Sequence, residues 1–545
     1  MSTQRRPQRA AVANHTGAPH RAAVANHADD DDDGDLSQGS DSDEPGMNIN
    51  DGAQRFIDDN KTESTYQNYR GTLKLFRDYL VANNLQKYLT PSQEWVLLDL
   101  PTEIVKCFSK EKLANLDPAV VVNFISDRST IKAGKRQGQT RSYESCSLPR
   151  SAIKHLLKKL GLPPPYSWEL PVSECLRGMK RSVSQKKLSG DMALVEGKAQ
   201  LPVAAYKMIN KIAMQASENH RANICNHMFT VLQWNLIARS VSISSLKLSH
   251  LRWENDCLQI TLPMHKGDQD GSCAAPKHVF ANPDDPANCP ILALAIWFFG
   301  LFVDSAAPGI NASIFQGTGD AEERYNGWLQ TILQGNAVAL QEFFVDIKRI
   351  ASHSLRKGAS VFAASTPGGP DGLSIFLRAG WSIGQVVQRY LLLGDGKDHF
   401  LGRFLVGFPL ESPSFARLPP HFKPGALSPE DLASLGIPVI PQFDATIIPH
   451  LLAQLVYHYD PTTNNLTVPL HASNPLLHTR AFTSGLLRKL RNANGVVAGL
   501  FRCEHTGMSA SGIPPWVNIY RAVRRAVRLA RYKIHNKTLT FVLAS

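Results

Sequence analysis

Six side chains in this sequence have the types and the order needed to bind a phosphodiester and attack it: Arg239, Lys266, His353, Arg356, Trp381 and Tyr390. Arginine stays charged and offers a planar fork that matches phosphate oxygens, so Arg239 and Arg356 suit the non-bridging oxygens. His353 precedes Arg356 by one helical turn, so its imidazole can donate to the same group. The indole N–H of Trp381 can supply a further donor. Fixed cations and donors of this kind can stabilise a pentavalent transition state without a metal.

Tyr390 is the candidate nucleophile of this set. A phenol has a pKa of about 10 and reacts poorly when neutral, but a cluster of cations favours the phenolate. Lys266 follows a predicted strand, where its side chain could protonate the leaving hydroxyl as a general acid. The product would be a phosphotyrosine linkage that conserves the energy of the bond for rejoining. The chemistry therefore predicts no cofactor, no metal ion and no need for ATP.

Each of these residues also has a structural interpretation when it is taken singly. A His-x-x-Arg pattern occurs in many helices, and Trp381 and Tyr390 would both suit a packed core. Arg239 follows an apolar helix and could pair with a carboxylate. The order and the spacing favour a site instead. Arg239 and Lys266 are 27 positions apart, Arg356 and Trp381 are 25 apart, and Trp381 and Tyr390 are 9 apart.

The elements that must position these residues can be predicted from hydrophobic periodicity. Helical spacing is replaced by alternation between Leu246 and Leu262, which indicates a β-hairpin with its turn at Asn255-Asp256. Residues 277–280 are predicted as a third strand. Helices are expected on both sides of these strands, over 203–216, 224–238, 290–301, 340–351, 353–365, 373–379 and 383–392.

The N-terminal third of the chain has a different composition. Residues 1–52 are poor in aliphatic side chains and strongly acidic from Asp29 to Glu44, which predicts a disordered tail. Residues 53–195 are expected to form a helical domain, with helices at 118–125 and 149–160. Basic residues crowd two segments interpreted as loops, 132–141 and 177–187, which could grip DNA phosphates or serve as nuclear localisation signals. They are Lys132, Lys135, Arg136, Arg141, Arg177, Lys180, Arg181, Lys186 and Lys187.

The C-terminal part is expected to be a helical extension over 431–545, joined by a Pro- and Ser-rich linker at 411–430. Its last predicted helix, 515–534, is amphipathic, with an apolar stripe opposite a stripe of arginines. The arginine stripe could contact DNA or be a solvated helix face.

The overall composition limits the classes of function. The net charge of +12 and the sequence pI of about 9.2 favour a polyanionic partner, with double-stranded DNA first among them. Ordinary surface lysine and arginine would give a similar balance. No apolar run reaches the roughly 18–20 residues of a membrane span, so no membrane partner is expected. The eight cysteines contain no Cys-x-x-Cys pair, which favours reduced thiols over a disulfide framework or a zinc site.

The set of six residues resembles that of the tyrosine recombinases, the phage-integrase-like family. The catalytic residues of that family follow one order along the chain: an arginine, a lysine in a β-hairpin, a His-x-x-Arg motif, a histidine or tryptophan, and a tyrosine. This sequence has a matching residue at every one of these positions, in the same order. Many members have an acidic residue three positions after the first arginine, where this chain has Ser242. The flanking sequence looks closest to eukaryotic Crypton-type transposon recombinases, through the segments 239–246, 266–271, 389–395, 402–403 and 512–515.

The resemblance implies a mainly α fold with a small β-sheet. A helical core-binding domain (53–195) would precede a mixed α/β catalytic domain (196–410) and the helical C-terminal extension. It also implies a nuclear enzyme that recombines or integrates a mobile element and assembles as a homotetramer on paired DNA sites. Two alternatives stay open: an activity like that of type IB topoisomerases, and a transposon-derived protein that binds DNA without catalysis.

Overall fold

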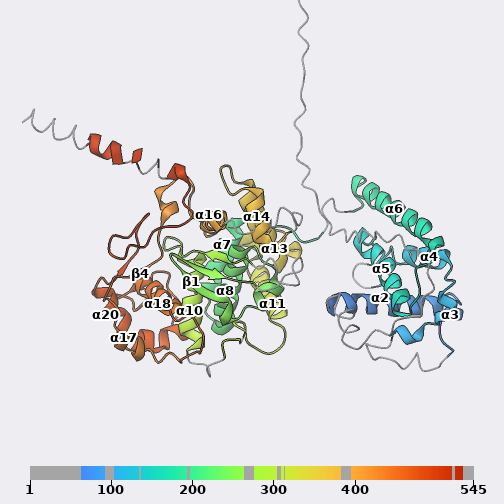
Figure 1. Ribbon diagram of the computed structural model, residues 1–545, viewed down its shortest axis with the longest axis horizontal. Helices are drawn as coiled ribbons and strands as arrows, with labels where there is room; N and C mark the ends of the chain where they lie inside the picture. The colour runs from blue at the N-terminus through green and yellow to red at the C-terminus, as the bar shows by residue number, and fades with distance from the viewer. Residues whose placement is uncertain are drawn as a thin grey trace, which may run out of the picture. The chain divides into compact units, whose positions relative to one another are not determined.

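The computed structural model describes residues 63–91, 104–133, 137–192, 197–262, 275–303, 309–311, 313–381 and 395–517, with short stretches from 519 to 531. The predicted tail at 1–52 and the predicted helix at 383–392 lie outside these residues. The chain forms two compact units, Met1–Leu194 and Val195–Ser545 (Figure 1). The division lies next to the domain boundary expected at 195/196. As the sequence predicts, the fold is mainly helical with small sheets.

The first unit is a packed set of helices: α2 (Glu63–Ala82), α3 (Lys110–Leu113), α4 (Pro118–Asp127), α5 (Tyr143–Lys159) and α6 (Tyr166–Leu188), with 3-10 turns at Gln86–Tyr88 and Ile104–Cys107. Apolar residues at helical spacing, among them Phe76 on α2 and Phe124 on α4, form its own hydrophobic core. Helix α5 starts six residues earlier than predicted. The Ser142 hydroxyl caps it by accepting from the Ser145 amide, and Pro149 is accommodated inside the helix.

The interpretation of residues 177–187 as a loop is wrong, because they form the C-terminal half of α6. Trp168, Val172, Leu176 and Val183 are buried at helical spacing, and this stripe holds the helix against the unit. The basic residues between them obscure that stripe in the sequence. They lie on the outer side of a helix rather than on a connection.

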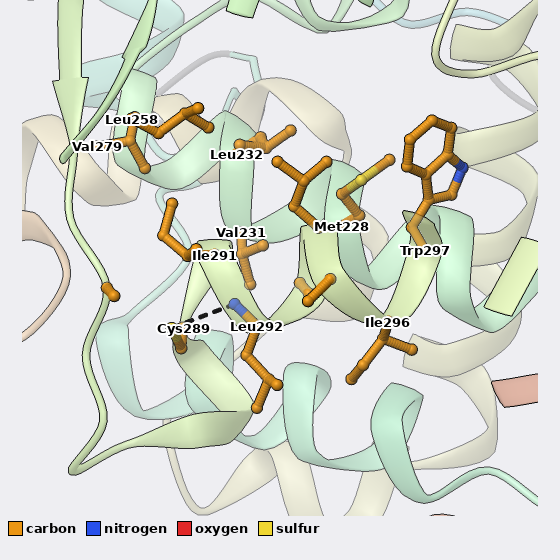
Figure 2. Packing of buried hydrophobic residues seen from close by; sticks show 14 of the residues in the cluster. Met228, Val231, Leu232, Leu258, Val279, Cys289, Ile291, Leu292, Ile296 and Trp297 are labelled. Carbon is orange, nitrogen blue, oxygen red and sulfur yellow. Dashed lines mark hydrogen bonds between the residues drawn. The ribbon is translucent and has the colours of Figure 1, made fainter. Parts of the chain in front are cut away.

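The second unit is built around α8 (His220–Leu236), in which every residue from Asn226 onward is buried. Helix α10 (Pro290–Trp297) is also buried along its whole length and continues as a π-helical turn, η6 (Phe298–Phe302). Figure 2 shows Ile291 of α10 beside Val231 of α8, and Trp297 and Met228 belong to the same cluster. Because α8 is fixed on all sides, the residues that follow its end are held firmly. Helix α7 (Val203–Gln215) packs alongside it.

The predicted hairpin is confirmed. Strands β1 (Leu251–Glu254) and β2 (Cys257–Ile260) pair antiparallel across the turn at Asn255-Asp256, and β3 (Lys277–Val279) adds to β2. The alternation at Leu246–Leu248 does not extend the strand, since the 3-10 turn η4 (Leu248–His250) precedes β1. Residue Asn255 turns the hairpin in the left-handed region at φ 50°.

The helices after the sheet differ in part from the prediction. Helices α13 (Ser352–Ser365) and α14 (Gly372–Ala379) agree with it. The helix predicted at 340–351 is wrong: α12 (Ala337–Gln341) stops early, Phe344 has a φ of 57°, and a 3-10 turn, η7 (Ile347–Arg349), follows. Helix α11 (Ala321–Gly335) was missed, although Asp320 caps it through the Glu323 amide. Helix α16 (Asp395–Leu405) packs on β3.

Residues 411–430 pack into the body instead of forming the expected linker. Phe415 and Leu418 have no exposed surface, and Phe415 shares one hydrophobic cluster with α8 and α10. The same cluster takes in apolar residues of the expected extension, from Leu435 to Val517. The elements in this part are α17 (Pro429–Ser434), α18 (Ile447–His458), α19 (Arg480–Thr483), α20 (Leu486–Asn492) and the short strands β4 (His421–Phe422), β5 (Tyr459–Asp460), β6 (Asn465–Leu466) and β7 (Val496–Val497).

Two general properties complete the description. The seven cysteines that the structure describes are all free thiols. Among the described helices, none combines the length and the apolar character that crossing a membrane would require.

Candidate phosphate-binding site

Arg239 is placed by the end of the buried helix α8. The chain leaves α8 through Ile237, a fully buried β-branched residue in the left-handed region at φ 48°. Arg239 is the N-terminal cap residue of α9 (Ser240–Ser244). The Ser242 and Ile243 amides donate to the Arg239 carbonyl at 3.0 and 3.1 Å. The side chain is half-buried, and its Nη1 atom is buried without a hydrogen-bond partner.

His353 and Arg356 lie one turn apart on α13, as predicted. The starts of α13 and α9 are joined, because the Ser352 hydroxyl lies 3.3 Å from the Ser240 hydroxyl. Ser240 in turn donates to a carboxylate oxygen of Glu322 on α11 at 2.5 Å. The residues next to the two serines, Arg239 and His353, are therefore held near each other although 114 positions separate them.

The electrostatic environment of His353 shows that the cations of the site act on one another. Burial lowers the pKa of His353 below its ordinary value, and Lys357, Arg356 and Arg239 lower it further. The side chain keeps substantial exposure to solvent. A neutral imidazole with solvent access can donate one hydrogen bond to an anion that enters the site.

Trp381 meets Arg356 at the end of α14. Gly380 closes that helix in the left-handed conformation at φ 66°, and the Trp381 amide donates to the Phe376 carbonyl at 2.9 Å. The almost completely buried Arg356 donates from Nη2 to the Ala379 carbonyl at 2.7 Å, and its guanidinium lies 5.5 Å from the centre of the Trp381 ring. The structure thus brings Arg239, His353, Arg356 and Trp381 into one region.

Lys277, on β3, belongs to the same region and was missed in the sequence. Its buried ammonium donates to the Arg378 carbonyl at 2.5 Å, one residue before the carbonyl that Arg356 uses. Burial is the main reason that the pKa of Lys277 is lowered to about 8. The charges of Arg378 and Arg356 also lower this pKa, whereas the charge of Asp398 raises it. Two cations therefore hold the C-terminal carbonyls of α14, where the helix dipole favours positive charge.

A buried ion pair ties α14 to α16. Arg378, whose side chain is fully buried, donates to the Asp398 carboxylate at 2.6 Å and to the Asn235 and His278 carbonyls at 2.8 and 2.9 Å. Asp398 also accepts from the His278 amide at 2.8 Å and lies 2.9 Å from its Nδ1. Burial alone would raise the pKa of the Asp398 carboxyl, but Arg378, His278 and Lys277 hold it well below its usual range.

Helix α16 is anchored again at its other end. Arg403, completely buried, pairs with Asp256 of the hairpin turn and donates from Nε to the Ser511 carbonyl at 2.5 Å. A Cβ at Gly402 would collide with the His278 carbonyl, so α16 and β3 approach as closely as their backbones allow. No sequence pattern marks these long-range partners.

One group of metal-ligating side chains occurs among the described residues, Asp256, Cys257 and His399, whose ligand atoms lie within 4.8 Å of one another. The Asp256 carboxylate already accepts from Arg403 and from the Ser511 hydroxyl and amide, at 2.7 and 3.0 Å for the latter two. A metal would have to displace a buried guanidinium, so this trio fits a structural network better than a metal centre.

The remaining predicted site residues have different outcomes. Lys266 and Tyr390 lie outside the described residues, as do Lys135 and Arg136. Ser242, which occupies the usual acidic position, is buried in α9, and the carboxylate that meets this helix is Glu322, through Ser240. In the first unit, Lys132 and Arg141 lie between α4 and α5. Helix α6 carries Arg177, Lys180, Arg181, Lys186 and Lys187.

Comparison with known proteins gives distant structural likenesses. No protein-family model and no curated protein matches the sequence. The XerH site-specific recombinase bound to its difH substrate is 13% identical with a TM-score of 0.35, over 59% of this chain and 92% of that one. A Flpe–Holliday junction complex is 11% identical with a TM-score of 0.29, over 80% and 100%. Ndc10, a platform for inner kinetochore assembly in budding yeast, is 14% identical with a TM-score of 0.21, over 72% and 98%. Scores this low do not establish a common fold, so the chemistry is inferred from the side chains described above.

Proposed function

We propose that this chain is an enzyme of the tyrosine recombinase type, which breaks and rejoins DNA strands through a 3′-phosphotyrosine intermediate. One observation carries the proposal. Arg239, His353 and Arg356 come together from segments more than a hundred residues apart, and the buried Nη1 of Arg239 has no acceptor among the described residues. A buried donor without a partner costs about 1–3 kcal/mol. A phosphate oxygen would supply the missing acceptor.

The site residues have distinct roles in the proposed reaction. Arg239 and Arg356 bind the non-bridging oxygens of the scissile phosphate, and His353 and the Trp381 indole donate to the same group. The phenolate of Tyr390 attacks phosphorus and forms the new P–O bond. The P–O5′ bond breaks, and Lys266 gives a proton to the leaving oxygen. Attack by a 5′ hydroxyl reverses these steps and rejoins the strand.

The biological setting that we propose follows from the resemblance of the motifs. The enzyme would recombine or integrate a Crypton-like mobile element in the nucleus, as a homotetramer on paired DNA sites. The net charge of +12 and the basic side chains of the first unit support a DNA partner. Whether the gene lies in a mobile element with short direct repeats is a direct check on this setting.

Covalent capture tests the chemistry. The full chain is incubated with a library of nicked random-sequence duplexes in the presence of EDTA, and protein–DNA adducts are isolated and sequenced. We expect adducts with the wild-type chain, none with Tyr390→Phe, and a yield near wild type with the control Tyr457→Phe. Loss of one stabilising donor by Arg356→Ala should slow capture by about 10²–10³-fold.

The alternatives give different results in the same experiment. Adducts that persist in Tyr390→Phe would overturn the assignment of the nucleophile. Relaxation of supercoiled plasmid without site preference at high dilution would indicate the topoisomerase-like activity. DNA binding without an adduct on any substrate would indicate a DNA-binding protein without catalysis.

A further inference from the structure

Helix α11 carries three polar side chains at four-residue spacing, Glu322, Asn326 and Gln330. Residues four apart lie on one face of a helix, so the three side chains form a single polar stripe. All three residues are half-buried, and the proposed chemistry uses none of them directly. The stripe is therefore placed to hold neighbouring segments of the chain.

Glu322 bonds to the segment that carries Arg239. Its carboxylate accepts from the Ser240 hydroxyl at 2.5 Å, and that hydroxyl in turn accepts from the Ser352 hydroxyl at 3.3 Å. An ionised carboxylate can only accept, so both hydrogen bonds point toward Glu322. The charge at the end of this series strengthens both bonds. Glu322 therefore holds the start of α9, where Arg239 is the cap residue, against the start of α13.

Asn326 and Gln330 bond to the segment that leads into α13. Asn326 accepts from the Ser352 amide at 3.2 Å, and Gln330 donates to the Ile350 carbonyl at 2.9 Å. The Ser352 amide is one of the first amides of α13, which have no acceptor within their own helix. The cap residue of α13 is an alanine, which has no side-chain acceptor. Asn326 thus caps α13 from another helix, one residue before His353.

The opposite face of α11 fastens it to α8, the buried helix at the centre of the second unit. Tyr325 stacks on Phe229 with ring centres 4.0 Å apart, and its hydroxyl lies 3.2 Å from that of Thr230. The Trp328 indole donates to the Asn223 side chain at 2.7 Å. A helix held in this way on a buried neighbour is a fixed support for both α9 and α13.

We propose that Glu322 and Asn326 are positioning residues that set the placement of Arg239 against His353. The inference rests on the proposed strand cleavage, which needs donors from both segments aimed at one phosphate. Bonds to a shared third helix hold the two segments in register before DNA arrives, so that little reorganisation is needed on binding. Neither residue would touch the phosphate. Loss of either should therefore slow cleavage without weakening the binding of DNA.

Single-turnover rates of covalent capture test the role of Glu322. The full chain is mixed in excess with a nicked duplex recovered by covalent capture, and adducts are counted over time. Glu322→Ala should slow capture by about 10²-fold with an unchanged Kd for DNA. Glu322→Gln keeps an acceptor oxygen for Ser240 but loses the charge, so its rate should lie between the two. The control Glu323→Ala removes the same charge from the next, exposed position of α11 and should capture DNA at the wild-type rate.

A double-mutant cycle separates positioning from a general loss of stability. If Glu322 acts by placing Arg239, then Glu322→Ala should slow capture little further in an Arg239→Ala background. Two effects that simply multiply would indicate a structural role only and would overturn the proposal.

The pKa of His353 gives a second readout that needs no DNA cleavage. It is followed by NMR of isotope-labelled histidine rings, and His353→Gln identifies the resonance. Arg239 helps to lower this pKa, so its release in Glu322→Ala should raise the pKa toward the ordinary value. Loss of the carboxylate charge acting directly would lower the pKa instead, so the sign separates the two effects. Asn326→Leu, which changes no charge, should also raise it.

The outcomes distinguish this proposal from the proposed function. A pKa of His353 that is unchanged or lowered in Glu322→Ala or in Asn326→Leu would overturn the role of that residue. A raised pKa together with no covalent adduct from the wild type would keep the positioning role and remove the chemistry. Tyr390-dependent adducts that both variants form at the wild-type rate would do the reverse.

Discussion

The buried ion pair between Arg378 and Asp398 should contribute both to stability and to the strand cleavage proposed above. Substituting Asp398 with asparagine removes the negative charge but preserves size and one acceptor oxygen. Arg378 then stays fully buried with its charge uncompensated, while its bonds to the Asn235 and His278 carbonyls remain. Segment 379–397, which carries Tyr390, would also lose the side-chain pair that joins its ends.

The size of the effect can be estimated from the burial of the pair. Removing one partner of a buried ion pair costs about 3–5 kcal/mol, since the other charge is left in a poorly solvating environment. The Asp398 side chain keeps 20% of its exposure, and asparagine can still accept from Arg378. We therefore expect the lower end, about 3 kcal/mol. That is a large part of the 5–15 kcal/mol typical of folded domains, but the protein should still fold.

Urea unfolding of the full chain measures this loss by tryptophan fluorescence. Six of the eight tryptophans lie in the second unit, so the signal reports mainly on its transition. The control is Lys397→Gln, next to Asp398 on α16. It removes an exposed ion pair with Asp371, the N-terminal cap of α14, and should cost less than about 1 kcal/mol. In capture experiments Asp398→Asn should form adducts more slowly while binding DNA as the wild type does.

Acid provides an independent check on the same pair. The pKa of Asp398 is depressed in the folded chain, so its stabilisation is present above the unfolded pKa of about 3.9 and is lost as the pH falls below it. The stability gap between wild type and Asp398→Asn should therefore narrow below about pH 4. A gap under about 1 kcal/mol at pH 7, or one that does not change with acid, would refute the reasoning.

Two further predictions follow from close packing and from buried histidines. Gly358→Ala should destabilise the second unit, although alanine usually favours a helix by about 1 kcal/mol, because its Cβ would collide with the Leu201 carbonyl. Thermal unfolding measures this, and an unchanged or raised melting temperature would contradict it. Acid should also destabilise the fold through three histidines that burial keeps neutral. Their folded pKa values lie below the unfolded value, so stability is complete above about pH 6.5 and falls by about 1–2 kcal/mol per histidine at pH 5. Urea unfolding at about pH 6.5 and at pH 5 tests this. Substitution of each histidine by glutamine should reduce the difference in the free energy of unfolding between the two pH values. Burial lowers the pKa to about 4 in His227 and His458 and to about 3 in His450.

The sequence predicts those elements in which local pattern and burial agree. The hairpin at 251–260 alternates because one face packs on the core, and α13 and α14 have clear helical spacing. The shared helix face of His353 and Arg356 follows from that spacing alone. Hydrophobic periodicity gives a wrong prediction in segments that are rich in charged residues or in proline. The basic half of α6 reads as a loop, and Phe415 is hidden in a Pro- and Ser-rich stretch that packs into the core.

Long-range partners could not be predicted in this way. Lys277 and Arg378 are separated by about a hundred residues, and nothing in either local sequence marks the bond between them. Asp398, the anionic partner of Arg378, also follows the last of the six predicted site residues, Tyr390, in the chain. Such contacts depend on how β3, α14 and α16 pack. One sequence read by periodicity does not contain that information.

The junction of Arg378 with Asp398 has a consequence for how this protein could change over time. The pair joins the end of α14 to the start of α16, at two positions that are 20 apart in the chain. The entropy of closing such a segment rises slowly with length, by about 0.6 kcal/mol for each doubling. Insertions or deletions between positions 382 and 394 would fall outside α14, α16 and Trp381. Segment 382–394, which contains Tyr390, should therefore tolerate changes of length better than the helices on either side of it. It is a suitable segment for engineering and for divergence between related sequences.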